Sequence, residues 1–171
     1  MAVFIGLPMA QSTAIASPTT PSAPASGKEH CVVVLGKVGP GQSSRVAHEH
    51  CSPTAFDKAA YLRQPDVKAR LNAERVTADV LLMQWWSDTD FKGQNLQVWG
   101  GAGPCDGEGY TYDPANYWRA NLSSIELMHP DCDRVTVHDT SLRKSASFSI
   151  SPRYFGSAIN DNVGRVHVYR H

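Results

Sequence analysis

Hydrophobic and polar positions alternate along the second half of the chain, in short runs separated by turn residues. The runs are residues 81–86, 94–99, 123–128, 134–138, 145–150 and 164–169. A period of two places one side of a run against a core and the other in water, which is typical of a β-strand. Short strands in this number predict an all-β sandwich. The glycine-rich stretches 100–104 and 105–109 are predicted to be loops.

The first half predicts a hairpin followed by a short helix. Two further β-rich runs, residues 31–38 and 43–51, stand on either side of a Gly/Pro turn. Ser52 and the proline after it offer an N-cap and a first helical residue, and Pro65 is expected to end the helix. Residues 66–79 could resume as helix or form an irregular connection.

The composition changes sharply at residue 28. Residues 1–27 contain no Lys, Arg, Asp or Glu. We interpret residues 1–16 as a signal peptide and residues 17–27 as a Pro/Ser/Thr-rich tether, which makes the protein secreted and extracellular. Residues 28–80 then form the N-terminal hairpin and helical connection, and residues 81–171 the sandwich. The part after the tether has the size of one domain.

The cysteines fit this interpretation as two disulfides. An even number in an exported chain favours oxidation, and four cysteines allow three pairings. We favour Cys31 with Cys51, which would close the hairpin, and Cys105 with Cys132, which bracket part of the sandwich. Zinc ligation is the alternative, because histidines accompany the first pair: His30, His48 and His50. Zinc sites usually contain closely spaced cysteine pairs, however, and none is present.

The charge balance argues against two classes of partner. The chain has 16 basic and 16 acidic residues, so its formal net charge is zero. No overall positive field attracts nucleic acid or anionic lipid, and no basic run stands out in the sequence. We expect neither nucleic acid nor a membrane as a partner, and we expect a monomer.

One segment predicts a hairpin that folds back over its own sheet. Trp86 ends one strand, Phe91 follows five residues later, and Gly93 stands two further on. Phe91 could cover Trp86, because aromatic rings pack favourably edge to face or offset. Gly93 could supply the positive φ of such a fold. Alternation places Trp85 on the opposite face from Trp86, so Trp85 is expected outside the core that holds the other large aromatics.

The spacing from Trp86 to Gly93 resembles the signature of βγ-crystallin Greek-key motifs. Ser123 and Ser124 fall where that family has paired serines, and residues 137–145 resemble a degraded second copy. The resemblance covers residues 81–169 and implies a βγ-crystallin-like Greek-key sandwich, here preceded by the hairpin and the short helix. The whole architecture resembles secreted crystallin-like proteins of actinobacteria, a family related in fold to microbial metalloproteinase inhibitors and killer toxins.

The same resemblance implies candidate calcium ligands. Each family loop offers acidic or amide residues followed by hydroxyls, and calcium requires six to eight oxygens. Here the first loop keeps the hydroxyls and the second keeps the acid and the amide, so one shared site would consist of Ser123, Asn160 and Asp161. The cations Arg119 and Arg165 beside these loops argue against binding. No cofactor other than calcium is expected.

The function that these patterns support is an exported, non-enzymatic binding module. Its partner would be an extracellular protease, which it would inhibit, or a cell-wall or cell-surface component. The expected contact surface is the glycine-rich loop 100–112, with Tyr110 and Tyr112 as contact residues. Two alternatives remain open: a small secreted hydrolase with a site around the histidines, and a calcium-stabilised structural protein.

Overall fold

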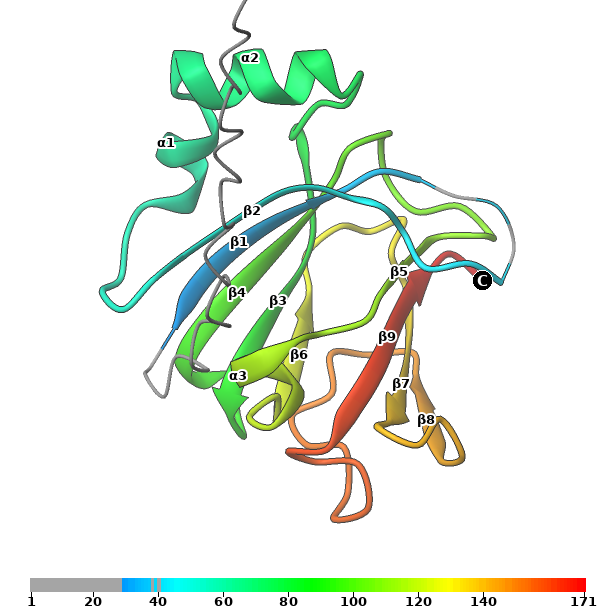
Figure 1. Cartoon of the computed structure of the whole chain (residues 1–171). Coiled ribbons are helices and arrows are strands. Elements are labelled where there is room, and N and C mark those ends of the chain that lie inside the picture. Colours follow the sequence, from blue (N-terminus) through cyan, green and yellow to red (C-terminus); the bar gives the residue numbers. More distant parts are fainter. Residues whose placement is uncertain (1–28, 38, 40) are drawn as a thin grey trace, which may run out of the picture.

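The computed structural model describes residues 29–171 apart from residues 38 and 40, so the predicted signal peptide and tether lie outside the described residues (Figure 1). The elements are β1 (His30–Leu35), β2 (Val46–Ser52), α1 (Lys58–Leu62), α2 (Pro65–Ala73), β3 (Val80–Asp88), β4 (Lys92–Gly100), β5 (Tyr110–Tyr112), α3 (Asn116–Arg119), β6 (Ser124–Leu127), β7 (Arg134–Asp139), β8 (Ser145–Phe148) and β9 (Val163–Tyr169). No helix in this part of the chain is long and apolar enough to cross a bilayer.

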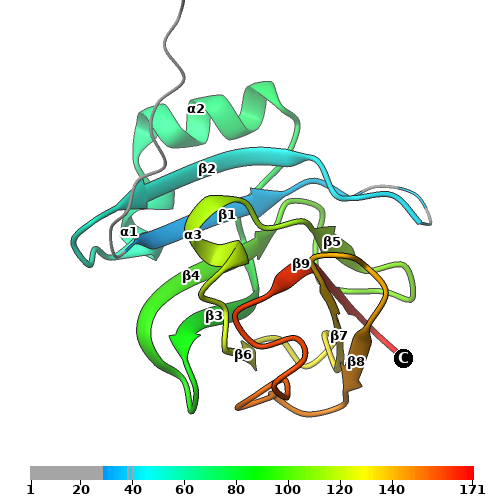
Figure 2. The same ribbon diagram turned by 60° about the horizontal axis from the view of Figure 1, so that its bottom comes forward.

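The strands form two sheets that pack face to face. The first sheet has the order β2-β1-β4-β3-β6, and the second has the order β5-β9-β7-β8. One continuous apolar core fills the space between them, and its largest side chain, Trp85, is fully buried. Two views of the molecule place α1 and α2 beyond the first sheet, on the side away from the second (Figures 1 and 2).

Strand exchange between the sheets makes this a Greek-key sandwich. β6 returns beside β3, and β9 returns beside β7, so each fourth strand pairs with the first strand of its unit. The third strand of the first unit, β5, pairs instead with β9 in the opposite sheet. In the second unit the corresponding segment reaches the first sheet, where the Ile125 amide donates to the Pro152 carbonyl at 3.0 Å. The fold is therefore the βγ-crystallin-like sandwich that the sequence predicted.

The N-terminal hairpin continues the first sheet. β1 pairs antiparallel with β2 and, on its other side, parallel with β4. Cys31 lies opposite Cys51 in the hairpin and is bonded to it, while Cys105 is bonded to Cys132. Both predicted pairings are thus confirmed, and the described residues contain no free cysteine.

The helices begin at residues other than those predicted. Ser52 is the last residue of β2 and not an N-cap, because α1 begins after Asp57, whose carboxylate accepts from the Ala60 amide at 2.9 Å. Pro65 is the first residue of α2, where its missing N–H costs no hydrogen bond. Residues 66–73 therefore continue as helix.

The two helices have an apolar cluster of their own. Val32 and Val34, on the outer face of β1, are fully buried beneath Leu62, Val67 and Leu71. The outer face of the first sheet is therefore closed over β1 by a second, smaller core.

The predicted folded hairpin is present between β3 and β4. Gly93 has φ +84°, and a Cβ there would collide with the Ser87 hydroxyl and lie 2.9 Å from the Asp88 Cγ. The buried Ser124 hydroxyl fastens the loop, because it donates to the Asp88 carbonyl at 2.7 Å and accepts from the Phe91 amide at 3.1 Å. The positive φ predicted for Gly93 is confirmed.

Two aromatic predictions for this hairpin are wrong. Phe91 packs against the Arg153 guanidinium, 5.0 Å from its ring centre, and no ring contact with Trp86 is found in the described residues. Trp85 belongs to the core and Trp86 is half-buried on the outer face. The alternation was correct, but its inner and outer sides were assigned in reverse.

Candidate functional site

The three predicted calcium ligands lie together where the two Greek-key loops meet. The Ser123 hydroxyl donates to the Asp161 carboxylate at 2.8 Å and accepts from the Asn160 amide at 3.1 Å. The Asn160 amide also donates to the other Asp161 oxygen at 2.9 Å. The Asn160 Oδ1 atom is buried and has no hydrogen-bond partner. The residues that the sequence selected are therefore neighbours, although they are far apart along the chain.

These oxygens would suit a hard cation. Asp161 supplies a carboxylate, Asn160 a free amide oxygen and Ser123 a hydroxyl, so backbone carbonyls or water would have to complete the six to eight oxygens of a calcium shell. The nearby cations have other partners: Arg119 donates to the Thr140 carbonyl at 3.3 Å, and Arg165 binds Asp113. When bound, calcium would join the two loops. Calcium binding stays a prediction.

The structure corrects the placement of the two predicted contact tyrosines. Tyr110 is 1% exposed and Tyr112 is 6% exposed, and both belong to the core. The Tyr110 hydroxyl donates to the Gly103 carbonyl at 2.7 Å, and Trp85 lies against the Tyr112 ring. A strand, β5, begins at Tyr110, and alternation turns both rings inward. Tyr110 and Tyr112 therefore hold the loop to the core and cannot line a contact surface.

The histidines of β2 stack around one tyrosine. The His50 ring lies 4.4 Å from the Tyr61 ring, and the His48 Nε2 atom lies 3.1 Å from the Tyr61 hydroxyl. The pKa of His48 lies below its ordinary value, first because of burial and then because of the nearby Arg70 charge. In the described residues no serine or threonine hydroxyl is hydrogen-bonded to a histidine, so the nucleophile and base of a hydrolase are not assembled here.

A groove beside the helices is lined by both polar and apolar side chains, with Arg63, Lys68 and Asp79 among the polar ones. It has a volume of about 600 Å³ and is lined by Leu62, Leu71, Val76 and Trp99 among others. Next to it the sheet carries amides that bond to one another, since Gln84 accepts from both Asn95 and Gln97. These side-chain amides therefore act as hydrogen-bond partners for one another.

The outer face of the second sheet has a different character. Along β7 and β9 buried valines alternate with half-buried polar residues that point away from the core. Register places His138 opposite Arg165, and Thr136 opposite both His167 and Ser147. The outward positions of the four strands are Thr111, Arg134, Thr136, His138, Ser145, Ser147, Arg165, His167 and Tyr169. None of them is acidic, and we call this set the basic face.

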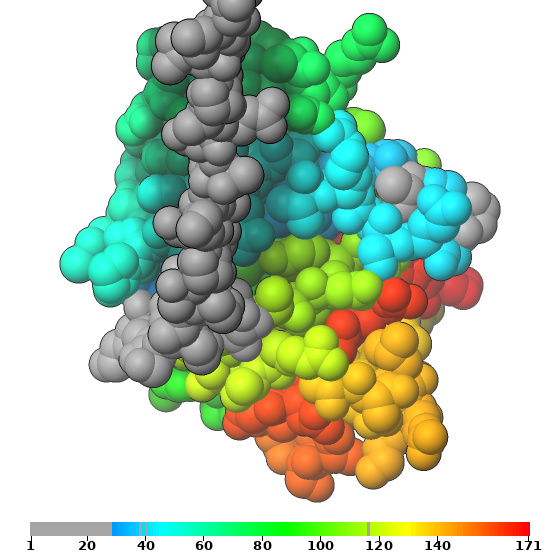
Figure 3. Space-filling view, in the orientation of Figure 1, coloured from blue at the N-terminus to red at the C-terminus, as the bar shows by residue number. Residues whose placement is uncertain are grey.

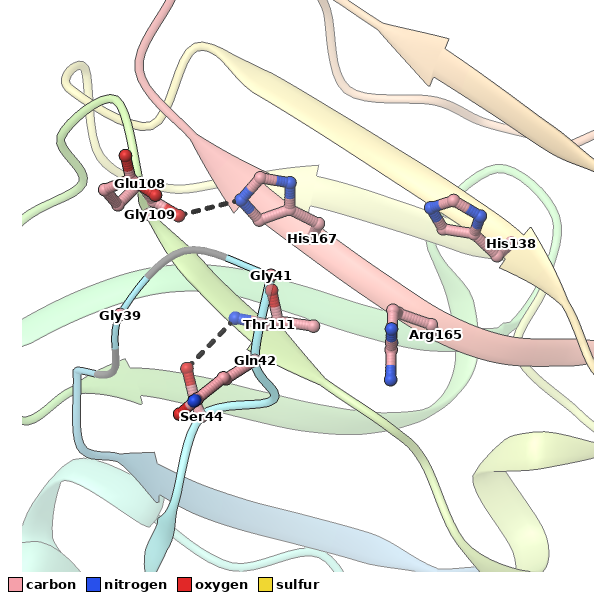
Figure 4. A pocket seen from close by; sticks show the side chains of 10 residues that line it. All are labelled: Gly39, Gly41, Gln42, Ser44, Glu108, Gly109, Thr111, His138, Arg165 and His167. Atoms are coloured by element: carbon pink, nitrogen blue, oxygen red, sulfur yellow. Dashed lines mark hydrogen bonds between the residues drawn. The ribbon is translucent and has the colours of Figure 1, made fainter. Parts of the chain in front are cut away.

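A pocket of about 200 Å³ opens at one side of the basic face (Figure 4). Arg165 and His167 from β9 and His138 from β7 line it, together with Glu108 and residues of the loop that follows β1. The segment after Gly41 lies beside the last strand on the molecular surface (Figure 3), and the Ser43 hydroxyl accepts from Arg165 at 3.1 Å. The N-terminal hairpin thus completes a pocket on the opposite sheet.

Arg165 is held in a fixed orientation. Its Nε and Nη2 atoms donate to the Asp113 carboxylate at 2.7 and 2.9 Å. The hydrogen bonds from Arg165 are the main cause that lowers the pKa of Asp113. Burial of the carboxyl acts in the opposite direction, and the hydrogen bond from Ser43 lowers the pKa further. No hydrogen bond from Arg165 Nη1 is found in the described residues, so two guanidinium donors remain for a ligand.

The histidines of the pocket have unequal surroundings. Burial lowers the pKa of His138 most, and the charges of Arg165 and His167 lower it further, against the opposing effect of Asp139 and Asp113. The His167 Nε2 atom lies 2.9 Å from the Glu108 carbonyl, and its ring stacks on Tyr169 at 4.6 Å. An anion in the pocket would therefore meet a fixed guanidinium and two imidazoles, with Glu108 as the acidic residue of the lining.

Sequence reasoning missed the basic face because its residues form no run. Arg134 and His138 are separated by other residues, as are Arg165 and His167. The available signal was the alternation itself: inside the predicted strands 134–138 and 164–169, the positions opposite the valines carry only basic, hydroxyl or aromatic residues.

Comparisons with known proteins add a likeness of fold only. No family model matches the chain, and no curated protein matches it. A βγ-crystallin domain from Clostridium beijerinckii is 9% identical, with 52% of this chain and 97% of that chain covered and a TM-score of 0.37. One from Flavobacterium johnsoniae is 13% identical over 53% and 96% of the two chains, with a TM-score of 0.37. Hahellin, a βγ-crystallin, is 16% identical over 53% and 93%, with a TM-score of 0.36.

Likenesses of this size indicate no function. The strand order and register of this chain define its fold. The actinobacterial origin and the relation to metalloproteinase inhibitors and killer toxins stay predictions.

Proposed function

We propose that the protein is an exported, non-enzymatic module that binds a cell-surface or cell-wall component through the basic face. The observation that carries the proposal is the composition of that face. The chain has equal numbers of acidic and basic residues, yet the outward positions of the second sheet include two arginines and two histidines and no acid. A sheet face that is only solvated would be expected to mix both signs.

The surroundings of the face also favour binding. Within the described residues no helix covers it, whereas α1 and α2 cover part of the other outer face (Figure 2). The strands beneath it are anchored by a core of fully buried valines, including Val135 and Val166. A rigid, preorganised surface loses little conformational entropy when a ligand binds.

Export is supported by the cysteines. Both disulfides would be reduced in a typical cytosol and persist in an oxidising compartment. An extracellular location, together with a partner on a cell surface, forms part of the proposal.

Co-sedimentation with insoluble cell-wall material would test this function. The blocking variant is Ser147→Trp, which places a large ring at an exposed position of β8. Its matched control is Ala69→Trp, at an exposed position of α2. We expect the wild type and the control to sediment with the material, and the blocking variant to bind about tenfold more weakly, a loss of about 1.4 kcal/mol.

Two results would count against the proposal. If the folded wild type sediments with no cell-surface material, the function is wrong, and inhibition of an extracellular protease in a parallel assay would favour the inhibitor prediction instead. If the blocking variant and its control bind equally well, the basic face is not the binding surface.

A further inference from the structure

We propose that the ligand of the basic face is an acidic polysaccharide, and that the pocket beside Arg165 holds one of its anionic groups. This inference rests on the proposed function and names the chemistry of its ligand. Three features of the face support it: the spacing of its charges, the groups between them, and the unused donors of the guanidinium.

The two arginines of the face lie near its opposite ends and not at one point. Arg134 and His138 are four residues apart on the same side of β7, which corresponds to about 13 Å. Arg165 lies opposite His138, and Tyr169 lies opposite Arg134. A polymer with several anionic groups along its length could place one group at each end of the face.

Neutral groups that suit sugar hydroxyls lie between the charges. Thr136 and Ser147 are hydrogen-bonded through their side chains at 2.8 Å, near the middle of the face. Each hydroxyl can donate one hydrogen bond and accept two, so both keep capacity for a ligand. The His167 and Tyr169 rings, stacked at an interplanar angle of 15°, add a flat surface beside them.

The pocket offers a defined place for an anion. Asp113 occupies one edge of the Arg165 guanidinium, and the Nη1 edge makes no hydrogen bond in the described part of the chain. Arginine binds carboxylate, sulfate or phosphate oxygens through paired N–H donors.

Nucleic acid fits this face less well. A duplex carries one charge per 1.7 Å of its axis, and proteins that bind it neutralise several phosphates at once. The basic face has only two arginines, and Asp113 already balances one of them. A ligand that carries sugar hydroxyls as well as charges matches these residues better.

Dextran and dextran sulfate form a suitable pair of probes, because they share a backbone and differ in charge. Binding of the intact protein would be measured by calorimetry at fixed salt, with polygalacturonate as a carboxylate polymer and a single-stranded oligonucleotide as a phosphate polymer. We expect binding to dextran sulfate and polygalacturonate, none to dextran, and weaker binding to the oligonucleotide.

Three variants localise the contact. Arg134→Gln should weaken binding about two- to fivefold, as the loss of one exposed charge contact does. The pair Arg165→Gln with Asp113→Asn keeps the net charge and removes the guanidinium, and it should weaken binding about tenfold or more. Arg63→Gln removes one exposed charge beside α1 and should leave binding within about twofold. Thermal unfolding of each variant verifies that it folds.

The outcomes separate this inference from the proposed function. Equal binding to dextran and dextran sulfate, tighter binding to the oligonucleotide, or an equal loss in Arg63→Gln and Arg134→Gln would overturn the inference, even if the protein still sediments with cell-wall material. Charge-dependent binding to dextran sulfate without any cell-wall binding would support this chemistry and overturn the proposed function. If the double variant unfolds, Arg134→Gln alone decides the outcome.

Discussion

The two outer faces of the sandwich differ in what covers them. On the first sheet, Val32 and Val34 lie beneath two helices and are fully buried. On the second sheet, the corresponding outward positions of β7 and β9 carry half-buried polar residues, and no helix of the described part of the chain lies above them (Figure 1). One face therefore contributes to stability, and the other is free to contact a partner.

The folded hairpins of the two halves are fixed by different residues. The first is fixed by Gly93 and by the buried Ser124 hydroxyl. The second is closed by Asp139, whose carboxylate accepts from the Arg143 and Lys144 amides at 2.9 and 3.1 Å. The second half thus keeps the shape of the motif with other residues, so a degraded sequence motif need not mean a lost fold.

The largest expected effect concerns the covered face. Leu71→Ala should lower the free energy of unfolding by about 2–4 kcal/mol, because it opens a cavity in the smaller core. Thr136→Ala, on the basic face, should change it by no more than about 0.5 kcal/mol. Denaturant unfolding of both variants measures the difference. Similar values for the two would contradict the claim that only the first face is structural.

The second largest effect on the free energy of unfolding should separate the two hairpins. Gly93→Val should lower the free energy of unfolding by about 1–3 kcal/mol, since valine resists a positive φ and its Cβ would collide with Ser87. Lys144→Val, at an exposed position of the second hairpin, should have a small effect of about 0.5 kcal/mol. An unchanged denaturant midpoint for Gly93→Val would show that the first hairpin is not fixed in this way.

Acid should destabilise the protein through both halves. The pKa values of His48 and His138 lie below 6.5, so the unfolded chain binds more protons as the pH falls below 6.5. The pKa of Asp113 lies below 3.8, so its contribution is complete above pH 3.8 and is lost as the pH falls through the lower folded value. Unfolding midpoints measured from pH 7 to pH 3 should fall in both windows. A stability that rises on acidification would contradict this.

The smallest expected effect is a change in the pKa of His138 that His48 does not share. Addition of dextran sulfate should raise the pKa of His138, because a nearby anion favours the protonated imidazole. The pKa of His48, which lies beside Tyr61 on the other half, should not move. A proton NMR titration of the imidazoles distinguishes the two, and an equal shift in both would point to a general ionic effect.

Much of the fold could be predicted from the sequence, because it depends on local patterns. Of the nine strands in the described residues, alternation located six, β3, β4 and β6 to β9, and the two β-rich runs around the Gly/Pro turn located β1 and β2. Gly93 was identified by the spacing of its motif. β5 was missed because three residues after a glycine-rich loop give no periodic signal. The start of α1 was missed because Ser52 and Asp57 are both good N-caps, and only the length of β2 decides between them.

The candidate site could be predicted less well, because it depends on contacts between distant segments. Ser123 and Asp161 were placed together by the motif, but Tyr110 and Tyr112 were assigned to the surface without knowledge of the strand that turns them inward. The pocket requires the loop after β1 to reach Arg165 on the last strand, a contact between residues 122 positions apart. No local pattern encodes such a contact.

The most direct test of the account is to map where an acidic polysaccharide binds. Backbone amide NMR of the protein, titrated with short fragments of polygalacturonate, would report each residue separately. If the ligand binds to the basic face, we expect shifts at Thr136, His138, Arg165 and His167, with little change at Gln84 on the first sheet. Shifts confined to the first sheet, or none at saturating fragment, would contradict the claim that the uncovered face of the second sheet binds the ligand.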